Sequence, residues 1–315
     1  MTYAGLSQAL ASGVLQGGFL ALAASGFSLI FGVQRILNVA QGAFTVLAAY
    51  ITIQFSIVLT PQLHLDPIAS IPLDFALLAV FGGALYLLVI RRVEGKGFEA
   101  PLLVTFGISL LMEYAFANGL GPIPAIDPSG GLVATAASQG YASQSLRLGA
   151  VYLPEGEVIA FGIALAAIPL MQLLLARTYD GRAIRATAQD PEAAEFSGID
   201  TSKYRLLSFM LGSGMAGVAG ALLALTGSVT PTSGETFLLP IIIIVVVLGG
   251  LGSLWGTLAG GVFVGVVANL SGYLALSLPI SSGFHADLGN LVMYSIFIGV
   301  LLLRPSGLFG KEERF

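Results

Sequence analysis

The sequence contains no cysteine and only two histidines among its 315 residues. Without cysteine, the chain has no disulfide, no thiolate metal site and no cysteine nucleophile. His64 and His285 both lie outside the apolar runs, so a histidine-based metal site or catalytic triad has little to build from. Charged residues make up 10% of the chain, against roughly 25% in soluble domains. A soluble fold with so little charge would expose a continuous apolar surface and aggregate.

Nucleotide hydrolysis and nucleic-acid binding are also disfavoured by what is missing. The P-loop pattern G-x4-G-K-[ST] does not occur, and none of the lysines follows a glycine-rich loop. The net charge of −4 argues against a nucleic-acid partner. No nucleophile with an activating base, and no acid–base pair, is seen at membrane depth, so the chain is not expected to be an enzyme.

Hydrophobic residues make up 56% of the chain and gather in nine apolar runs. A hydrocarbon core of about 30 Å needs roughly 20 helical residues. The runs therefore predict an all-α polytopic membrane protein with eight or nine transmembrane helices. The seventh run has Pro240 near its start and Gly249 near its end, so it is expected to be short or re-entrant. The runs are 12–32, 40–60, 71–90, 100–118, 157–176, 206–227, 237–250, 256–275 and 287–303.

Basic residues orient the chain, because cytoplasmic loops of membrane proteins are enriched in Lys and Arg. With the N-terminus outside, twelve of the thirteen basic residues fall in inner segments and only Arg147 lies outside. The C-terminus is then cytoplasmic. Because the first positive charge is Arg35, the first run is expected to be a true span rather than a cleaved signal. Residues 1–315 are expected to form a single membrane domain, with an outer loop at about 119–156 and an inner loop at about 177–205.

The inner loop predicts a helix of about two turns. Asp190 can serve as the N-cap, and Pro191 suits the first helical position. Glu192 and Glu195 favour the start of the helix dipole, and Gly198 offers a left-handed stop. So short a helix persists only if something packs on it. It is either a solvated connector or a rigid knob that fits a groove on a cytoplasmic partner.

The same segment carries a family resemblance. Its pattern E-A-A-x3-G resembles the opening of the EAA loop of ABC importer permeases, and its surroundings, GRAIRATAQDPEAAEFSGID, are similar to the branched-chain amino acid permease family. Three further blocks resemble that family in the same order, so the likeness covers nearly the whole chain from residue 10 to 310. The arrangement is more similar to the H-type than to the M-type subunit. These blocks are FGVQRILNVAQGAFTVLAAY (31–50), VVVLGGLGSLWGTLAGGVFVG (245–265) and LLLRPSGLFG (301–310).

The resemblance implies a permease subunit of an ATP-driven importer in a prokaryotic cell membrane. Its partners would be a second, M-type permease, two cytoplasmic ABC ATPases and an external binding protein. ATP and magnesium would bind to the ATPases, and this chain would hold no cofactor or metal. The solute would be small and net-neutral: a branched-chain or related amino acid, or alternatively urea or a short amide. An ion-coupled secondary transporter is the competing class, and it commonly shows inverted repeats that are not seen here. The implied ATPase-coupling residues are Arg182, Arg185, Asp190, Glu192, Ala193, Ala194, Glu195 and Gly198.

Polar side chains inside a membrane domain are costly, so they face a neighbouring helix, water or solute. Asn38, Gln41, Glu113 and Asn118 are the candidates for lining a translocation path. Glu113 is read as the only carboxylate well inside an apolar run, and pairing across a helix interface is its alternative role. Asn38 could instead cap a helix break, and part of the turn around it is expected to face water.

Glycines at every fourth position allow close helix packing. Gly252, Gly256 and Gly260 follow this spacing, and Gly265 extends the set. The surroundings contain no βαβ unit, so helix packing is favoured over dinucleotide binding.

Overall fold

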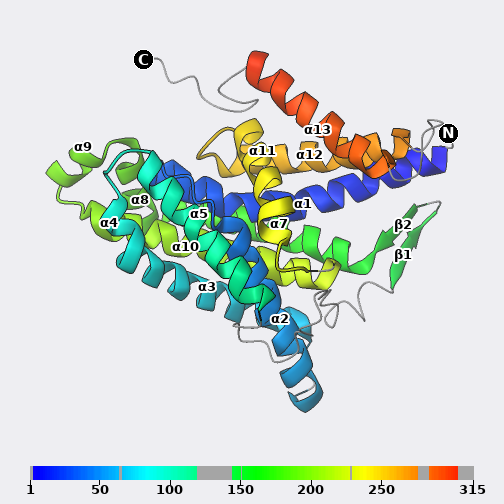
Figure 1. Ribbon diagram of the computed structural model, residues 1–315, viewed down its shortest axis with the longest axis horizontal. Coiled ribbons are helices and arrows are strands. Elements are labelled where there is room, and N and C mark those ends of the chain that lie inside the picture. The colour runs from blue at the N-terminus through cyan, green and yellow to red at the C-terminus, as the bar shows by residue number, and fades with distance from the viewer. Residues whose placement is uncertain are drawn as a thin grey trace.

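The computed structural model describes residues 3–63, 66–118, 144–149, 151–227, 229–275 and 284–303. A helix occupies each of the nine apolar runs (Figure 1). In chain order the elements are α1 (Tyr3–Gln34), α2 (Gln41–Leu63), η1 (Pro67–Ser70), α3 (Ile71–Leu85), η2 (Tyr86–Ile90), α4 (Arg91–Val93), α5 (Glu99–Ala117), β1 (Ser145–Leu148), β2 (Val151–Pro154), α7 (Glu155–Arg177), α8 (Tyr179–Gln189), α9 (Pro191–Phe196), α10 (Thr201–Thr226), η3 (Gly234–Leu238), α11 (Leu239–Gly249), α12 (Leu254–Ala275) and α13 (Phe284–Leu303).

The all-α polytopic class predicted from the sequence is confirmed. Among the described residues, six helical segments are long and apolar enough to cross a membrane, and three further apolar helices are shorter. The count of eight or nine crossings stays a prediction. The seventh run is short, as expected: η3 and α11 together cover Gly234–Gly249, which at 1.5 Å per residue is about 24 Å long.

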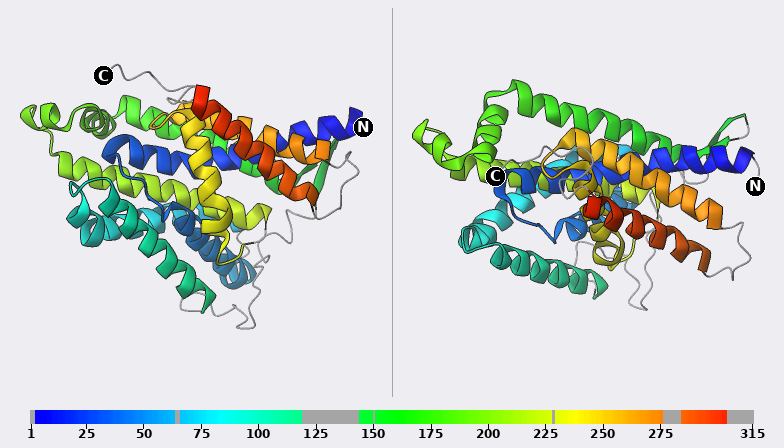
Figure 2. Two further views of the ribbon diagram at one scale, coloured as in Figure 1. Left: turned by 45° about the horizontal axis from the view of Figure 1, so that its top comes forward. Right: turned by 90° about the horizontal axis from the view of Figure 1, so that it is seen from above.

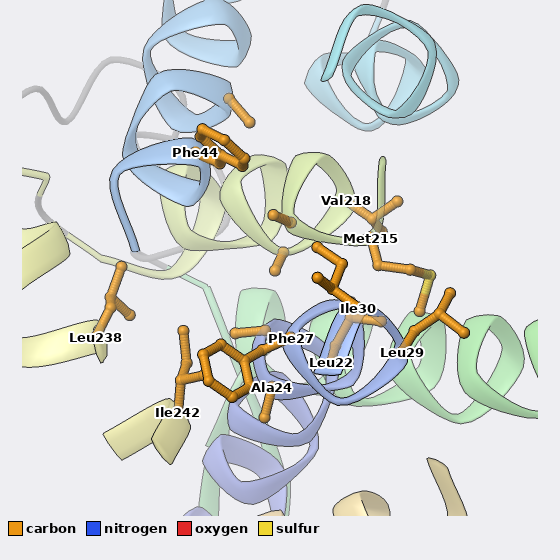
Figure 3. Packing of buried hydrophobic residues seen from close by; sticks show 14 of the residues in the cluster. Leu22, Ala24, Phe27, Leu29, Ile30, Phe44, Met215, Val218, Leu238 and Ile242 are labelled. Atoms are coloured by element: carbon orange, nitrogen blue, oxygen red, sulfur yellow. The ribbon is translucent and has the colours of Figure 1, made fainter. Parts of the chain in front are cut away.

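The helices α1 and α10 form the centre of the bundle. In their most apolar stretches 83% and 72% of the residues are buried, against 28% in α5, α7 and α12. The most extensive contacts of α1 are with α12 and α10, while α10 also packs on α2 and α3 (Figure 2). Figure 3 shows Phe27 of α1 beside Ile242 of α11, and Ile30 near Met215 of α10. Both central helices therefore pack against protein over most of their length.

The two ends of the molecule carry different structures (Figure 1). At one end, the antiparallel hairpin β1–β2 lies beside the start of α1. The Gln8 amide accepts from the Tyr152 N–H at 2.8 Å and donates to the Tyr152 carbonyl at 2.6 Å, as a third strand would. We call this the hairpin end. The opposite end, the α9 end, carries α8 and α9. The hairpin lies within the predicted outer loop at about 119–156; residues 119–143 lie outside the described part of the chain.

Between α1 and α2 the chain enters the bundle, and of this turn Arg35 is exposed, as was expected for part of it. Gln34 donates to the Arg205 carbonyl of α10 at 2.7 Å, and Gln41 donates to the Gly212 carbonyl at 3.2 Å. These two carbonyls are seven residues apart on one helix, which is about 10 Å. Asn38, in the middle of this non-helical segment, is 1% exposed. Thr105 of α5 bonds the main chain on either side of it, so the buried backbone is satisfied without a helix.

Three of the four predicted packing glycines lie on α12 where another helix approaches. A Cβ on Gly260 would lie 2.7 Å from the Val245 carbonyl oxygen of α11, and Gly256 faces the same helix. Gly265 faces α1. Gly252 lies in the turn before α12, where an added Cβ would lie 3.1 Å from the Gly32 Cα of α1, and its φ of +81° is a backbone conformation that favours glycine.

Candidate functional site

The predicted inner loop folds into two short helices rather than one. The Thr178 hydroxyl accepts from the Gly181 N–H at 3.0 Å and starts α8, which the sequence reasoning did not anticipate. Ala183 and Ile184 on α8 are buried. The loop is also shorter than expected, because α7 ends at Arg177 and α10 begins at Thr201. The last five residues of the predicted loop 177–205 therefore belong to the start of α10.

The second helix, α9, has the predicted boundaries and caps. The Asp190 carboxylate accepts from the Ala193 N–H at 3.0 Å, with Pro191 in the first turn. Gly198 follows the helix with φ +80°. The Thr201 hydroxyl donates to the Glu195 carboxylate and ties α9 to the start of α10. A helix of six residues is thus held at both ends by side-chain contacts.

The surface of α9 is uneven in a way that suits docking. Ala194 is buried toward the protein, whereas Glu192, Ala193 and Glu195 are exposed. Phe196 at its tip is 92% exposed. A large aromatic side chain held out on a rigid helix is a typical anchor for a protein partner. The other predicted coupling residues, Arg182 and Arg185, are exposed on α8.

Two cavities separate this loop from the helical bundle. One, of about 560 Å³, lies between α9 and the α9-end termini of α1 and α10. The other, of about 420 Å³, lies between α8, α7, α1 and the turn before α12. The α8–α9 loop is therefore seated on the bundle with space on both sides of its contacts.

A polar clamp lies at the same end. Arg205 of α10 pairs with Glu94 at 3.3 Å, and the Tyr86 hydroxyl donates to the other Glu94 oxygen at 2.6 Å. Gln34 holds the Arg205 carbonyl. The clamp thereby ties the start of α10 to α1 and to the segment between α3 and α5.

Hydrogen bonds link two of the four predicted path residues. Asn38 donates to the Gln41 side-chain oxygen at 3.1 Å, and Gln41 reaches α10 through the Gly212 carbonyl. Gln41 is fully buried, and the Asn38 side-chain oxygen is buried without a partner. This pair sits at the start of α2, where it bridges the helix break to α10.

The other two path candidates lie along α5. Glu113 is half-buried, and its carboxyl group lies within reach of the Glu235 carboxyl of η3. Asn118 is exposed and donates to the Tyr114 carbonyl at 2.9 Å, which ends α5. Asn118 therefore acts as a helix cap in this structure.

Asp74 was overlooked by the sequence reasoning, which took Glu113 as the only carboxylate well inside an apolar run. Asp74 of α3 has no exposed surface. It accepts from the Thr52 hydroxyl of α2 at 2.7 Å, and the Ser70 hydroxyl donates to Thr52 at 3.2 Å. Its other carboxyl oxygen is buried without a partner. This cluster joins α2 to η1 and α3.

Comparison with known proteins identifies the family of the chain. Residues 9–303 match the model of the family described as the permease component of the branched-chain amino acid transport system. The chain belongs to this permease family. The permease is 28% identical to a probable branched-chain amino acid transport permease, LivH, of Methanocaldococcus jannaschii, over 96% of this chain and 92% of that protein. It is 26% identical to the high-affinity branched-chain amino acid permease BraD of Pseudomonas aeruginosa, over 97% and 96%.

A shorter match extends to sugar transport. The permease is 33% identical to the fructose import permease FrcC of Rhizobium meliloti, over 39% of this chain and 35% of that protein. No solved structure matches the permease. These relatives are transport permeases, so the chain is a multi-pass transport subunit and not an enzyme.

Three features of the permease were missed from the sequence. Phe196 lies within the segment GRAIRATAQDPEAAEFSGID, and an aromatic residue at the end of the predicted helix could have indicated a docking anchor. Asp74 lies inside the third apolar run and was visible there as a lone charge. The Arg205–Glu94 pair joins residues 111 apart. No spacing rule in the sequence brings these two residues together.

Proposed function

We propose that the permease is the transmembrane subunit of an ATP-driven ABC importer for branched-chain or related amino acids. It would pair with a second, M-type permease, two cytoplasmic ATPases that bind ATP and magnesium, and an external binding protein. In this arrangement the α9 end faces the cytoplasm and the hairpin end faces outside. Twelve of the thirteen basic residues then lie at inner positions, which supports this orientation.

The exposed tip of α9 is the observation that carries the proposal. The chain has no P-loop of its own, so ATP-driven import requires that energy enter through contact with another protein. The α9 knob, formed by Glu192, Ala193, Glu195 and Phe196, offers an apolar anchor with small and charged neighbours. A partner groove that accepts Phe196 would move α9 as a rigid unit.

The proposed mechanism is alternating access. ATP binding closes the ATPase pair and displaces α9, and the displacement passes into α10, which is separated from α9 by four residues. The bundle then rocks and exposes a central path to the opposite side. Selection of the solute would rest largely with the external binding protein. The names of the two near full-length relatives support branched-chain amino acids as the solute.

A pull-down of the tagged permease from native membranes tests the docking surface. Phe196→Ala removes the exposed anchor, and Phe98→Ala is its matched control. Phe98 is 56% exposed and lies just before α5, in the same group of inner segments. We expect wild type and Phe98→Ala to co-purify an ATPase and a second permease. Phe196→Ala should retain the permease and lose most of the ATPase.

Transport in vesicles tests the energy source and the solute. The purified complex is reconstituted with its co-purified binding protein, and uptake of labelled leucine is compared with uptake of labelled urea. We expect leucine uptake that requires ATP and is unaffected by collapse of proton and sodium gradients. Uptake of urea but not of leucine would show that the proposed solute is wrong and that urea is transported instead. Uptake that needs an ion gradient and not ATP would refute the importer.

A further inference from the structure

We infer that the cavity between α9 and the bundle is a binding site for a small zwitterionic amino acid on the cytoplasmic side. The inference rests on the proposed function for its orientation and for the role of α9. It adds a second site, outside any translocation path, at which the imported solute would restrain the coupling helix.

The cavity has two walls of opposite charge. The bundle wall carries Arg35, which follows α1, and Arg205 near the start of α10. The α9 wall carries Asp190, Glu192 and Glu195. The cavity therefore separates a cationic wall from an anionic wall.

The two walls are not paired with one another. Within the described part of the chain, the Arg205–Glu94 contact is the only ion pair, and Glu94 does not line the cavity. Arg35 and Glu192 make no side-chain hydrogen bond or ion pair among the described residues. Arg35 and Glu192, of opposite charge, thus both line a volume of about 560 Å³, which lies within the range of small-molecule sites.

The backbone at Arg35 provides a second observation. Its φ is +54°, and among the described residues it is the one non-glycine residue with positive φ. Arginine is uncommon in this conformation, and strained residues of this kind cluster at functional sites. The strained turn places a cationic side chain at the cavity where a glycine would fit the backbone more easily.

An α-amino acid complements these walls. Its carboxylate suits Arg35, since guanidinium groups bind carboxylates through paired donors. Its ammonium group suits Glu192. Val33, Ala188 and Pro191 also line the cavity and offer apolar contact to an aliphatic side chain. A solute that lacks one of these two charged groups would leave one wall unmatched.

Occupation would oppose coupling. A ligand held by both walls bridges α9 to α1 and α10, whereas the proposed mechanism requires α9 to move. A ligand that binds one arrangement better than the other shifts the equilibrium toward it. Accumulated amino acid inside the cell would therefore slow its own import.

The test uses the reconstituted complex with its ATPases facing the bath, so that additions to the bath reach only the cytoplasmic side. ATP hydrolysis is measured with binding protein and leucine fixed inside the vesicles. The bath then receives L-leucine, 4-methylpentanoate, which lacks the ammonium group, or L-leucinamide, which lacks the carboxylate. We expect leucine to inhibit, with a midpoint on the order of 1 mM. Each analogue should need at least about tenfold more, because it loses one charged contact.

A pair of charge-matched variants locates the site. Arg35→Gln should raise the leucine midpoint about tenfold. Arg92→Gln removes the same charge from an exposed position that does not line the cavity, and it should leave the midpoint unchanged. The analogue series on wild type does not depend on how well either variant folds.

The outcomes separate this inference from the proposed function. ATP-driven uptake without inhibition by leucine would overturn only the second site. Equal inhibition by leucine and its analogues, or equal shifts in the two variants, would also overturn it. If Arg35→Gln changed the rate of ATP hydrolysis and leucine in the bath had no effect, Arg35 would pair directly with the α9 wall and the second site would be overturned. A complex without ATP-driven uptake would refute the proposed function, and this inference with it.

Discussion

Two glycine-to-alanine substitutions should have opposite effects on stability. Gly17 lies on α1 against α12, and a Cβ there would lie 2.5 Å from the Val262 Cα. Gly162 lies on α7 with no atom within 4 Å of an added Cβ. Both glycines are inside helices, so both substitutions gain the same intrinsic helix preference. Only Gly17→Ala inserts a methyl group between two backbones.

The magnitudes follow from these contacts. Alanine is favoured over glycine in a helix interior by about 0.5–1 kcal/mol, so Gly162→Ala should stabilise the chain by that amount. Overpacking costs about 1–3 kcal/mol. Because the atom met at Gly17 is a Cα of a rigid helix, α1 and α12 must separate to accept the methyl group. The net effect of Gly17→Ala should be a loss of up to about 2 kcal/mol.

The free energy of unfolding of the purified single chain in detergent, from an SDS titration, measures both effects. The far-UV circular dichroism of each variant before titration serves as the control for folding. We expect the midpoint to rise for Gly162→Ala and to fall for Gly17→Ala. A fall of similar size for both variants would mean that helix flexibility, rather than the close approach of α1 and α12, explains these glycines.

Two further substitutions and one double-mutant cycle test contacts described above. Thr52→Val should lower the free energy of unfolding by about 1–3 kcal/mol in the same titration, because it leaves the buried Asp74 carboxyl without the Thr52 donor. A loss of less than about 0.5 kcal/mol, the size expected for an exposed site, would contradict this. Asp190→Ala should remove about 1 kcal/mol of capping from α9, and weaker ATPase recovery in the pull-down with unchanged permease pairing would report it. The Glu94–Arg205 pair should show a coupling of about 0.5–1 kcal/mol in a double-mutant cycle, and additive effects would refute the clamp.

The features predicted correctly from the sequence depend on neighbouring residues. The nine apolar runs gave helices because helical length in lipid is set by composition over about 20 residues. The start and end of α9 were predicted because Asp190 and Pro191 act on its first turn and Gly198 acts just after its last turn. Such local signals need no knowledge of what packs on the helix.

The features missed depend on contacts between distant segments. The burial of the segment around Asn38 was missed because Thr105 of α5 bonds the main chain on either side of Asn38, and the Gly212 carbonyl of α10 accepts from Gln41. Asp74 is tolerated inside α3 because hydroxyl groups of α2 and η1 surround it. The start of α8 was missed because Thr178 is an ordinary residue until its hydroxyl accepts from Gly181. In each case the partner lies on another element or becomes a partner only after folding.

The position of α10 gives a physical reason for how a push on α9 could reach the bundle. The Thr201 hydroxyl on Glu195 fixes the short link between the two helices, and Arg205 joins the next turn to Glu94. Further along α10, glycines at 212, 217 and 220 face the backbones of α1, α3 and α2 at distances that leave no room for a methyl group. Surfaces packed this closely resist sliding and move as a unit. A displacement of α9 would therefore be expected to carry α10 and its glycine-packed neighbours together, whereas α13, which contacts mainly α12, would follow only through that helix.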